Sequence, residues 1–118
     1  MHTQLELQNI GALADWSSAR DVVHALNLMG QSAQAQDYVV ASGELRSVRD
    51  LLATAFGHVG LDWMQFASFQ EDHTAPALVG LPQMLERALG WRRTLQFENV
   101  VAEMVDRDLA IEDALLKA

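Results

Sequence analysis

Cysteine is absent from the 118-residue chain, which excludes disulfide bonds, thiol catalysis and thiolate zinc sites. Positive charge is scarce as well, because 8 Lys and Arg stand against 16 Asp and Glu, giving a net charge of −8. This charge repels the phosphates of nucleic acids and anionic membrane surfaces, so we expect neither nucleic acid nor a membrane as a partner. The sequence also lacks a membrane-spanning apolar run and a basic leader followed by an apolar segment, which predicts a cytoplasmic protein.

Short catalytic and nucleotide-binding motifs are missing too. The sequence has no Gly-x-Ser-x-Gly, no P-loop and no Gly-x-Gly-x-x-Gly, and its glycines stand singly at expected helix ends. The histidines have no i,i+4 partner, so no metal site is predicted; they are His2, His24, His58 and His73. We place His24 and His58 at partly exposed helical positions. The acidic residues of the last predicted helix are typical of a solvated helix face.

Three short strands are predicted from the apolar pattern. Residues 4–10 alternate polar and apolar side chains, and 61–66 is a second short candidate. Residues 37–42, DYVVAS, form a β-branched run without alternation, which indicates a strand buried on both faces, as in a parallel sheet. A strand that begins at residue 4 also suggests a region taken from a longer chain.

Helical periodicity fills the intervals between and after these strands. A first helix is expected over 18–29, capped by Ser17 or Ser18 and stopped by Gly30, with four apolar residues on its inner stripe: Val22, Val23, Leu26 and Met29. Ser47 and Asp50 form a capping-box pattern for a second helix that ends at Gly60. A short helix over 82–90 and a long one from Phe97 complete the chain. The pattern predicts a single domain, 1–118, of small mixed α/β type.

Two arginines in the first turns of helices need an explanation, because each opposes the favourable sign of the helix dipole. For Arg20 we expect an ion pair with a neighbour such as Glu6. Arg49 either packs its stem on the strand ends or faces the crevice outside them, where α/β proteins bind ligands. Ordinary solvation suffices for Arg92 and Arg93.

Four blocks of the sequence, in order, resemble the C-terminal part of GDP-mannose 4,6-dehydratases, which are extended short-chain dehydrogenases of the NAD-dependent epimerase/dehydratase type. The blocks are NIGALADWSSARDVV, DYVVASGELRSVRDLL, LVGLPQMLERALGW and EMVDRDL. The positions that match the family pattern are Asn9, Asp15, Trp16, Asp21, Gly43, Ser47, Arg49, Gly80, Leu89, Gly90 and Trp91. The resemblance implies that Asn9 and Arg49 bind substrate, and that Asp15, Trp16 and Asp21 are framework residues.

The same resemblance implies what this sequence does not hold. The family's NADP-binding glycine loop and its Tyr-x-x-x-Lys catalytic pair lie in a larger N-terminal part, and Tyr38 is the single tyrosine here. Hydride transfer needs a held nicotinamide, so we expect no catalytic residue, no cofactor and no metal in this chain, and no catalysis by it alone.

Departures from the family pattern concern the diphosphate. Ala14 stands where the family has an arginine, Glu71 and Asp72 stand at an Arg-Pro pair, and residues 81–84 replace Asp-Pro-x-Lys. Each arginine bond to a phosphate contributes roughly 1.5–3 kcal/mol, so losing two costs about 3–6 kcal/mol. Only weak GDP-sugar binding is therefore expected.

Three hypotheses follow. The first is a truncated or stand-alone substrate-binding domain of a GDP-mannose 4,6-dehydratase-like protein, which needs a Rossmann-domain partner or self-associates through exposed apolar surface. The second, alternative hypothesis is a non-catalytic interaction module that kept the fold and lost sugar-nucleotide binding. The third is a gene remnant that folds poorly, which a cooperative thermal transition would exclude.

Overall fold

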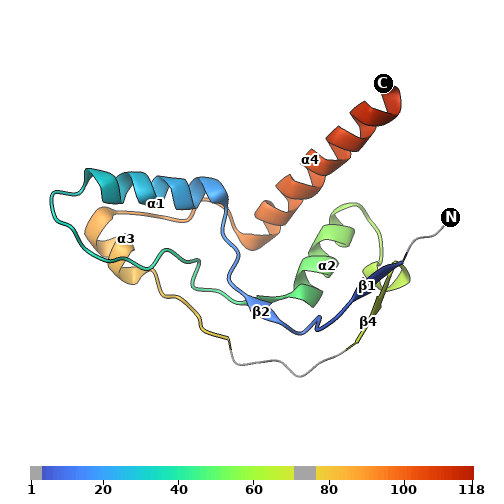
Figure 1. The fold of residues 1–118 in the computed structure, drawn as a ribbon, viewed down its shortest axis with the longest axis horizontal. Coiled ribbons are helices and arrows are strands. Elements are labelled where there is room, and N and C mark those ends of the chain that lie inside the picture. The colour runs from blue at the N-terminus through green and yellow to red at the C-terminus, as the bar shows by residue number, and fades with distance from the viewer. Residues whose placement is uncertain (1–3, 71–76) are drawn as a thin grey trace.

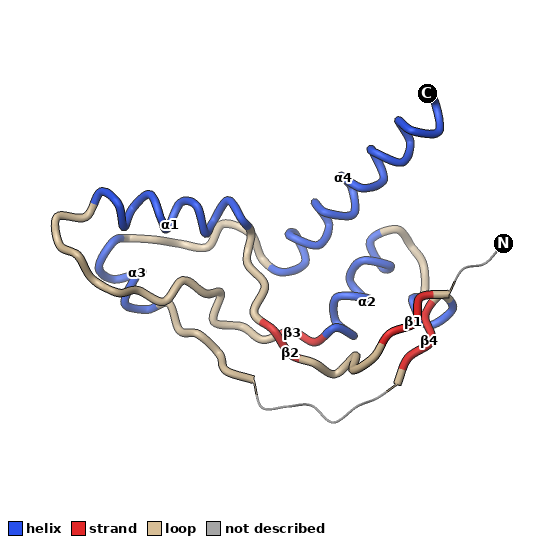
Figure 2. The backbone as a smooth tube through the Cα atoms, viewed as in Figure 1, coloured by secondary structure: helices blue, strands red, loops and turns tan. Residues whose placement is uncertain are grey.

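The computed structural model describes residues 4–70 and 77–118, and it is a mixed α/β structure, as the sequence predicts. The described residues form four α-helices and four short strands, and Figure 1 and Figure 2 show them on a thin, elongated frame. The helices are α1 (Ala19–Gln31), α2 (Val48–His58), α3 (Gln83–Leu89) and α4 (Phe97–Lys117). The strands are β1 (Leu5–Leu7), β2 (Leu13–Ala14), β3 (Arg46–Ser47) and β4 (Ala67–Phe69), and a 3-10 turn, η1 (Trp63–Gln65), precedes β4.

The strands form two separate two-stranded sheets. β1 pairs with β4 in parallel, with Leu5 opposite Ala67, which joins segments that are about sixty residues apart in the chain. β2 pairs with β3 antiparallel, with Leu13 opposite Ser47. The second sheet was not predicted, because each of its strands has two residues and no periodicity can register in so short a run.

Most helix ends follow the capping residues in the sequence. The Ser18 hydroxyl accepts a hydrogen bond from the Arg20 N–H and starts α1, and the capping box of Ser47 and Asp50 starts α2. Gly90 ends α3 in the left-handed conformation, with φ of 71°. The predicted stop at Gly30 is wrong, because α1 continues through it until the Ser32 N–H closes the last turn on the Met29 carbonyl.

Two strand predictions are wrong. Residues 37–42 have no regular secondary structure and pair with no strand among the described residues. Residues 61–66 turn instead of extending, because the Asp62 carboxylate caps η1 by accepting from the Met64 N–H, and β4 begins after this turn, at Ala67.

The inner face of α1 also differs from the predicted apolar stripe. Asp21 and Ala25 are the buried residues of this helix, while Val23 and Leu26 remain 62% and 56% exposed. The cause is a set of hydrogen bonds: the carboxylate and the carbonyl of Asp21 accept from donors in residues 91–95. These bonds fix the rotation of α1 about its axis. Apolar side chains are therefore left on the outer face of the helix.

Two small apolar clusters take the place of one central core. The first joins β1, α2, η1 and β4 and is built from Ile10, Leu52, Trp63 and Ala67. The second joins α1, α3 and the segment after α3 and is built from Ala25, Leu85 and Trp91, with Tyr38 and Val40 packed against it. α4 packs its first half on α2, and its second half projects away from the body (Figure 1).

The molecule is expanded for its size. Its radius of gyration is 17.6 Å, and its accessible surface is 8470 Å². A compact chain of 118 residues would have about 13.5 Å and about 6,400 Å². Roughly 2,000 Å² of surface is thus exposed in excess, much of it apolar side chains on α1, α4 and the segments beside α3. No helix in the described ranges is both long and apolar enough to cross a bilayer.

The second cluster can be tested by cutting back one leucine. Leu85 is fully buried, so Leu85→Ala should lower the free energy of unfolding by about 2–5 kcal/mol through lost burial and a cavity. Leu81, two residues before α3, is 55% exposed and serves as the matched control, for which Leu81→Ala should change stability by less than about 0.5 kcal/mol. Urea unfolding followed by circular dichroism measures both, and equal losses would contradict the cluster.

Candidate functional site

An open hollow lies along the parallel strand pair. It has a volume of about 500 Å³ and is lined by the two strands and the residues that follow them: Glu6, Leu7, Gln8, Ser68, Phe69 and Gln70. The carboxyl ends of parallel strands are where open α/β sheets bind ligands. The hollow is therefore the candidate site, and the polar side chains near it decide what it can bind.

Arg49 is held beside this hollow by aromatic rings. Its guanidinium carbon lies 5.6 Å from the ring centre of Phe69, which lines the hollow, and 5.7 Å from that of Trp63. Cation–π contacts of this kind hold a guanidinium in place. The side chain thus packs at the end of β4, as one interpretation of Arg49 expects, and the other, ligand binding at the strand ends, stays a prediction.

Asn9 lies at the same corner. The Arg49 N–H donates to the Ile10 carbonyl over 2.9 Å, which ties the start of α2 to the residue after Asn9. Asn9 has a left-handed backbone, with φ of 48°, and its side-chain oxygen is buried without a hydrogen-bond partner among the described residues. An unpaired buried acceptor costs about 1–3 kcal/mol, so this oxygen is suited to a donor from outside the described residues. Substrate binding by Asn9 and Arg49 stays a prediction.

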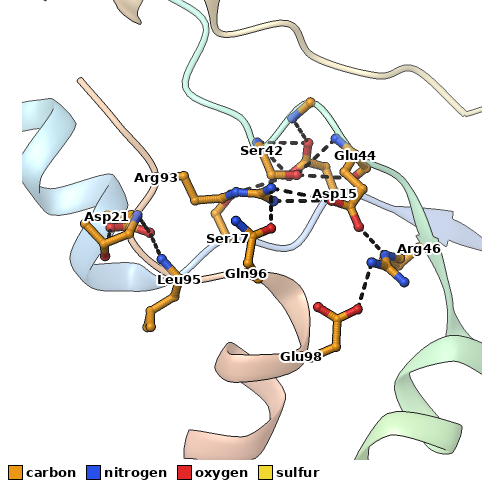
Figure 3. A network of polar contacts seen from close by, with 12 residues as sticks. Asp15, Ser17, Asp21, Ser42, Glu44, Arg46, Arg93, Leu95, Gln96 and Glu98 are labelled. Atoms are coloured by element: carbon orange, nitrogen blue, oxygen red, sulfur yellow. Dashed lines mark hydrogen bonds and ion pairs between the residues drawn. The ribbon is translucent and has the colours of Figure 1, made fainter. Parts of the chain in front are cut away.

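The turn at Ala14 and Asp15 is organised by a carboxylate. Asp15 accepts hydrogen bonds of 3.0 Å from the N–H groups of Ser42 and Gly43, where Gly43 has φ of 83° (Figure 3). Trp16 stacks on Phe97 at 5.7 Å between ring centres, which anchors the start of α4. Asp15 and Trp16 are therefore framework residues, as the resemblance implies.

Next to this turn lies a charged group that the sequence analysis did not identify. Arg46, opposite Ala14 across the β2–β3 pair, contacts Glu44 and bonds to Glu98 over 2.9 Å. The contact with Glu44 chiefly raises the pKa of Arg46. Arg46 was passed over because it has no helix-terminal or motif position; only its cross-strand pairing brings it to the corner.

Arg93 completes the group by bonding to Gln96 over 2.7 Å and approaching Glu44 at 3.5 Å (Figure 3). The expectation of ordinary solvation is therefore wrong for Arg93, although Arg92 is exposed. Glu44 and Glu98 pair with the guanidinium groups of Arg46 and Arg93, and the corner holds a third carboxylate, that of Asp15, on the Ser42 and Gly43 amides. Because the carboxylates outnumber the cations, this corner has no surplus positive charge for a diphosphate.

The expected partner of Arg20, a neighbour such as Glu6, is wrong. The Arg20 guanidinium instead lies 2.5 Å from the Glu103 carboxylate of α4, and this hydrogen bond raises the pKa of Arg20. The partner was missed because α4 crosses the start of α1, a long-range contact that local spacing does not reveal. The acidic face of α4 is solvated as predicted, and His24 and His58 are exposed, with His58 2.7 Å from Asp106.

Asp21 is the most deeply buried charged residue in the described part of the chain, at 2% exposure. Its carboxylate accepts from the Thr94 hydroxyl at 2.6 Å and from the N–H groups of Thr94 and Leu95, and its carbonyl accepts from the Trp91 indole at 2.9 Å. Burial by itself raises the pKa of Asp21, but these hydrogen bonds and the nearby His24 outweigh it, so the pKa lies below the ordinary 3.8. Asp21 is structural and takes no part in the candidate site.

Comparison with known proteins identifies the family of the chain. The sequence profile of the family described as GDP-mannose 4,6 dehydratase matches residues 1–104. The chain belongs to the GDP-mannose 4,6 dehydratase family. It is similar to two curated members from Arabidopsis thaliana, GDP-mannose 4,6 dehydratase 1 and 2, at 37% and 36% identity over 115 residues.

The match covers nearly all of this chain but only part of each relative. It includes 94% of this chain but 31–32% of each Arabidopsis relative, so the chain spans about a third of their length. Among solved structures, the chain resembles a dTDP-glucose 4,6-dehydratase from Bacillus anthracis in complex with NAD, with a TM-score of 0.77 at 14% identity over 88% of this chain and 34% of that one. This likeness shows that the fold is shared with extended short-chain dehydrogenases.

The described residues do not fit the dinucleotide of such enzymes. A pyrophosphate binds to free N–H groups at a helix that follows a strand. In this member of the GDP-mannose 4,6 dehydratase family, the Ser18 hydroxyl already accepts from the Arg20 N–H in the first turn of α1, and the Ser47 hydroxyl from the Asp50 N–H in the first turn of α2. Tyr38 packs against the second cluster, with its hydroxyl 3.5 Å from Gln36, and does not line the hollow.

Several expectations fall outside the described ranges. Glu71 and Asp72, at the family's Arg-Pro pair, lie there, as do His2 and His73. Within residues 4–70 and 77–118, no three His, Asp or Glu side chains converge as a metal site would require.

The role of Asp21 can be tested through pH. Its lowered pKa means that the ionised form stabilises the fold above the unfolded-state pKa of about 3.9 and that this stabilisation is lost as pH falls through the folded-state pKa. Asp21→Asn should therefore lower the free energy of unfolding by about 1.5–3 kcal/mol at pH 7, and by less below pH 4. Asp108→Asn on the exposed face of α4 is the control, measured by urea unfolding; a loss independent of pH would contradict this assignment.

Proposed function

We propose that this chain is the substrate-binding part of a GDP-mannose 4,6-dehydratase-like protein and that it acts together with a cofactor-binding part. The family profile over residues 1–104 supports this function, and one structural observation carries it: the Arg49 guanidinium is fixed on Phe69 at the hollow beside the parallel strands. A guanidinium held in this way is suited to the phosphates or the sugar hydroxyls of a nucleotide sugar. In this arrangement the second polar contact is Asn9, whose unpaired oxygen would accept from a hydroxyl.

The proposed division of work follows from chemistry. Dehydration of a nucleotide sugar by hydride transfer needs a nicotinamide and an adjacent proton donor. Neither fits the described residues, since the helix starts are capped and Tyr38 is packed away from the hollow. NADP and the catalytic residues would therefore belong to the cofactor-binding part. The excess surface of roughly 2,000 Å² supports such a partner, because it exceeds the about 800 Å² that each partner buries in a standard-size interface.

A second function is favoured by a specific observation. The corner at Asp15 has more carboxylates than cations, and Ala14 holds the position of the family's arginine. In this alternative the chain is a non-catalytic interaction module that keeps the fold and no longer binds GDP-sugars. The two functions differ in one measurable property, which is saturable binding of a sugar nucleotide.

Calorimetric titration with GDP-mannose and with GDP separates the two. The chain is titrated alone and in the presence of the cofactor-binding part of an Arabidopsis relative, expressed as the region outside the matched third. We expect weak, saturable binding that strengthens with the cofactor-binding part. Arg49→Ala should weaken it by about tenfold or more, the loss of one charge-assisted bond.

The controls separate charge from packing. Arg49→Met keeps an apolar stem against Trp63 and Phe69 while it removes the charge, so it should weaken binding as much as Arg49→Ala without an equal loss of stability. Arg107→Ala removes one charge from exposed α4 and should leave binding unchanged. If no binding occurs at millimolar ligand in either condition, the interaction module is the correct function.

A further inference from the structure

The groove between α2 and α4 is a second hollow, separate from the candidate site. It has a volume of about 210 Å³, and its walls are apolar side chains of the two helices and of the turn after α2: Ala55, Phe56, Val59, Leu61, Val105 and Leu109. It shares no lining residue with the hollow at the strand pair. Pockets for drug-sized ligands have about 300–1,000 Å³. The α2–α4 groove is smaller and suits apolar side chains of a protein partner.

The distal half of α4, residues 106–117, carries an apolar stripe onward from this groove. Every residue in this half is exposed, and the half points away from the body of the molecule (Figure 1). Val105, Leu109 and Leu116 are separated by four and seven residues, so they share one helix face. A helix of about 12 residues is marginal in water and gains its stability by packing an apolar face. Among the described residues, nothing packs on this stripe.

Two carboxylates lie on the same face as the stripe. Glu112 falls between Leu109 and Leu116, and Asp108 precedes Glu112 by one turn. Neither carboxylate has an ion pair within the described ranges. Two other acids of this half are paired inside the chain, at 2.7 Å each: Asp106 with His58 and Asp113 with Lys117. A partner that covers the stripe therefore has to bring cations to Asp108 and Glu112.

We propose that the α2–α4 groove and the stripe on the distal half of α4 bind a basic amphipathic helix of another protein. Its apolar residues enter the groove, and its lysines or arginines pair with Asp108 and Glu112. Laying the apolar face of a helix into a hydrophobic groove is a recurring mode of recognition. The partial negative charge at the C-terminal ends of α2 and α4 and the net charge of −8 add to the attraction of such a helix.

A second copy of this chain is the poorer occupant. A two-fold axis places the same patch against itself, so Asp108 and Glu112 would face their own counterparts, on two chains that each carry a net charge of −8. A membrane surface is a poorer occupant still, because amphipathic helices that lie on membranes are rich in Lys and Arg, whereas this face carries carboxylates. Charge thus selects a basic protein segment.

Fluorescence anisotropy with a labelled leucine/lysine peptide tests the proposal on the full chain. The peptide has about 18 residues, or five helical turns, with leucine at i, i+3, i+4 and i+7 and lysine elsewhere. We expect saturable, micromolar binding. A peptide with glutamate in place of lysine and a scrambled leucine/lysine peptide should each bind at least about tenfold more weakly. Equal binding of the scrambled peptide would reduce the attraction to net charge and overturn the proposal, as would absence of binding.

A pair of leucine variants locates the binding face. Leu109→Gln puts a polar group into the wall of the groove and should weaken binding of the leucine/lysine peptide by at least about tenfold. Leu26→Gln on α1, where Leu26 is 56% exposed, is the matched control and should leave binding unchanged. Circular dichroism checks that both variants keep their helices. Equal effects of the two variants would refute docking in the groove.

Two double variants of equal net charge test the carboxylates. Asp108→Asn with Glu112→Gln, and Asp37→Asn with Asp113→Asn, each remove two of the 16 acidic charges, which changes the net charge from −8 to −6. The first pair should weaken peptide binding by about two- to thirtyfold, the loss of two exposed ion pairs, and the second by less than about twofold. If both weaken it equally, the pairing with Asp108 and Glu112 is wrong.

Other occupants give distinct results. Self-association of the chain in sedimentation experiments that Leu109→Gln abolishes would assign the face to a second copy. Displacement of the peptide by the cofactor-binding part of Arabidopsis GDP-mannose 4,6 dehydratase 1 would assign it to that part. Either result overturns the proposal. Leu109→Gln should leave GDP-mannose titration unchanged, because the groove and the hollow share no lining residue, so failure of the sugar titration refutes the proposed function alone.

Discussion

The arrangement of this structure depends on the buried carboxylate of Asp21. Three hydrogen bonds to that carboxylate and one to the carbonyl of the same residue hold α1 against the segment from Trp91 to Leu95. This segment leads directly into α4, which packs on α2, and α2 in turn carries Arg49 to the hollow. A buried charge is tolerated when its hydrogen bonds replace those of water, and it then fixes one geometry, because few arrangements satisfy it. Here the geometry it fixes includes the exposure of Val23 and Leu26.

The candidate site combines features that survive from a nucleotide-sugar enzyme with features that oppose one. Arg49 keeps a cation at the strand ends, whereas the neighbouring corner at Asp15 has filled its amide groups and its arginines with carboxylates from the same chain. A carboxylate accepts the same donors that a phosphate does. The internal acids thus occupy donors that an anionic ligand would need.

Residues that act on near neighbours in the sequence allowed the helix ends to be predicted. The capping box at Ser47, the cap at Ser18 and the left-handed Gly90 were readable because each acts within four residues, and the α/β class followed from alternating periodicities. Long-range pairings were not readable: Arg20 with Glu103, and Arg46 opposite Ala14. The strand predicted at 37–42 failed for another reason, since a strand needs a partner and no described residue supplies one. At the site, sequence reasoning selected Arg49 from its helix position, but it could not foresee that aromatic rings would hold it.

The junction between the two apolar clusters has a further physical character. Besides the β2–β3 pair, the stacking of Trp16 on Phe97 and the hydrogen bonds of Asp15 and Asp21, it contains three ion pairs that solvent reaches: Arg46 with Glu98, Arg93 with Glu44, and Arg20 with Glu103. Charges exposed to solvent are screened over about 8 Å at physiological ionic strength and over about 3 Å in molar salt, whereas apolar packing is not weakened by salt. Added salt should therefore weaken the ionic part of this junction, while the apolar clusters and the buried Asp21 bonds keep their share of the stabilisation.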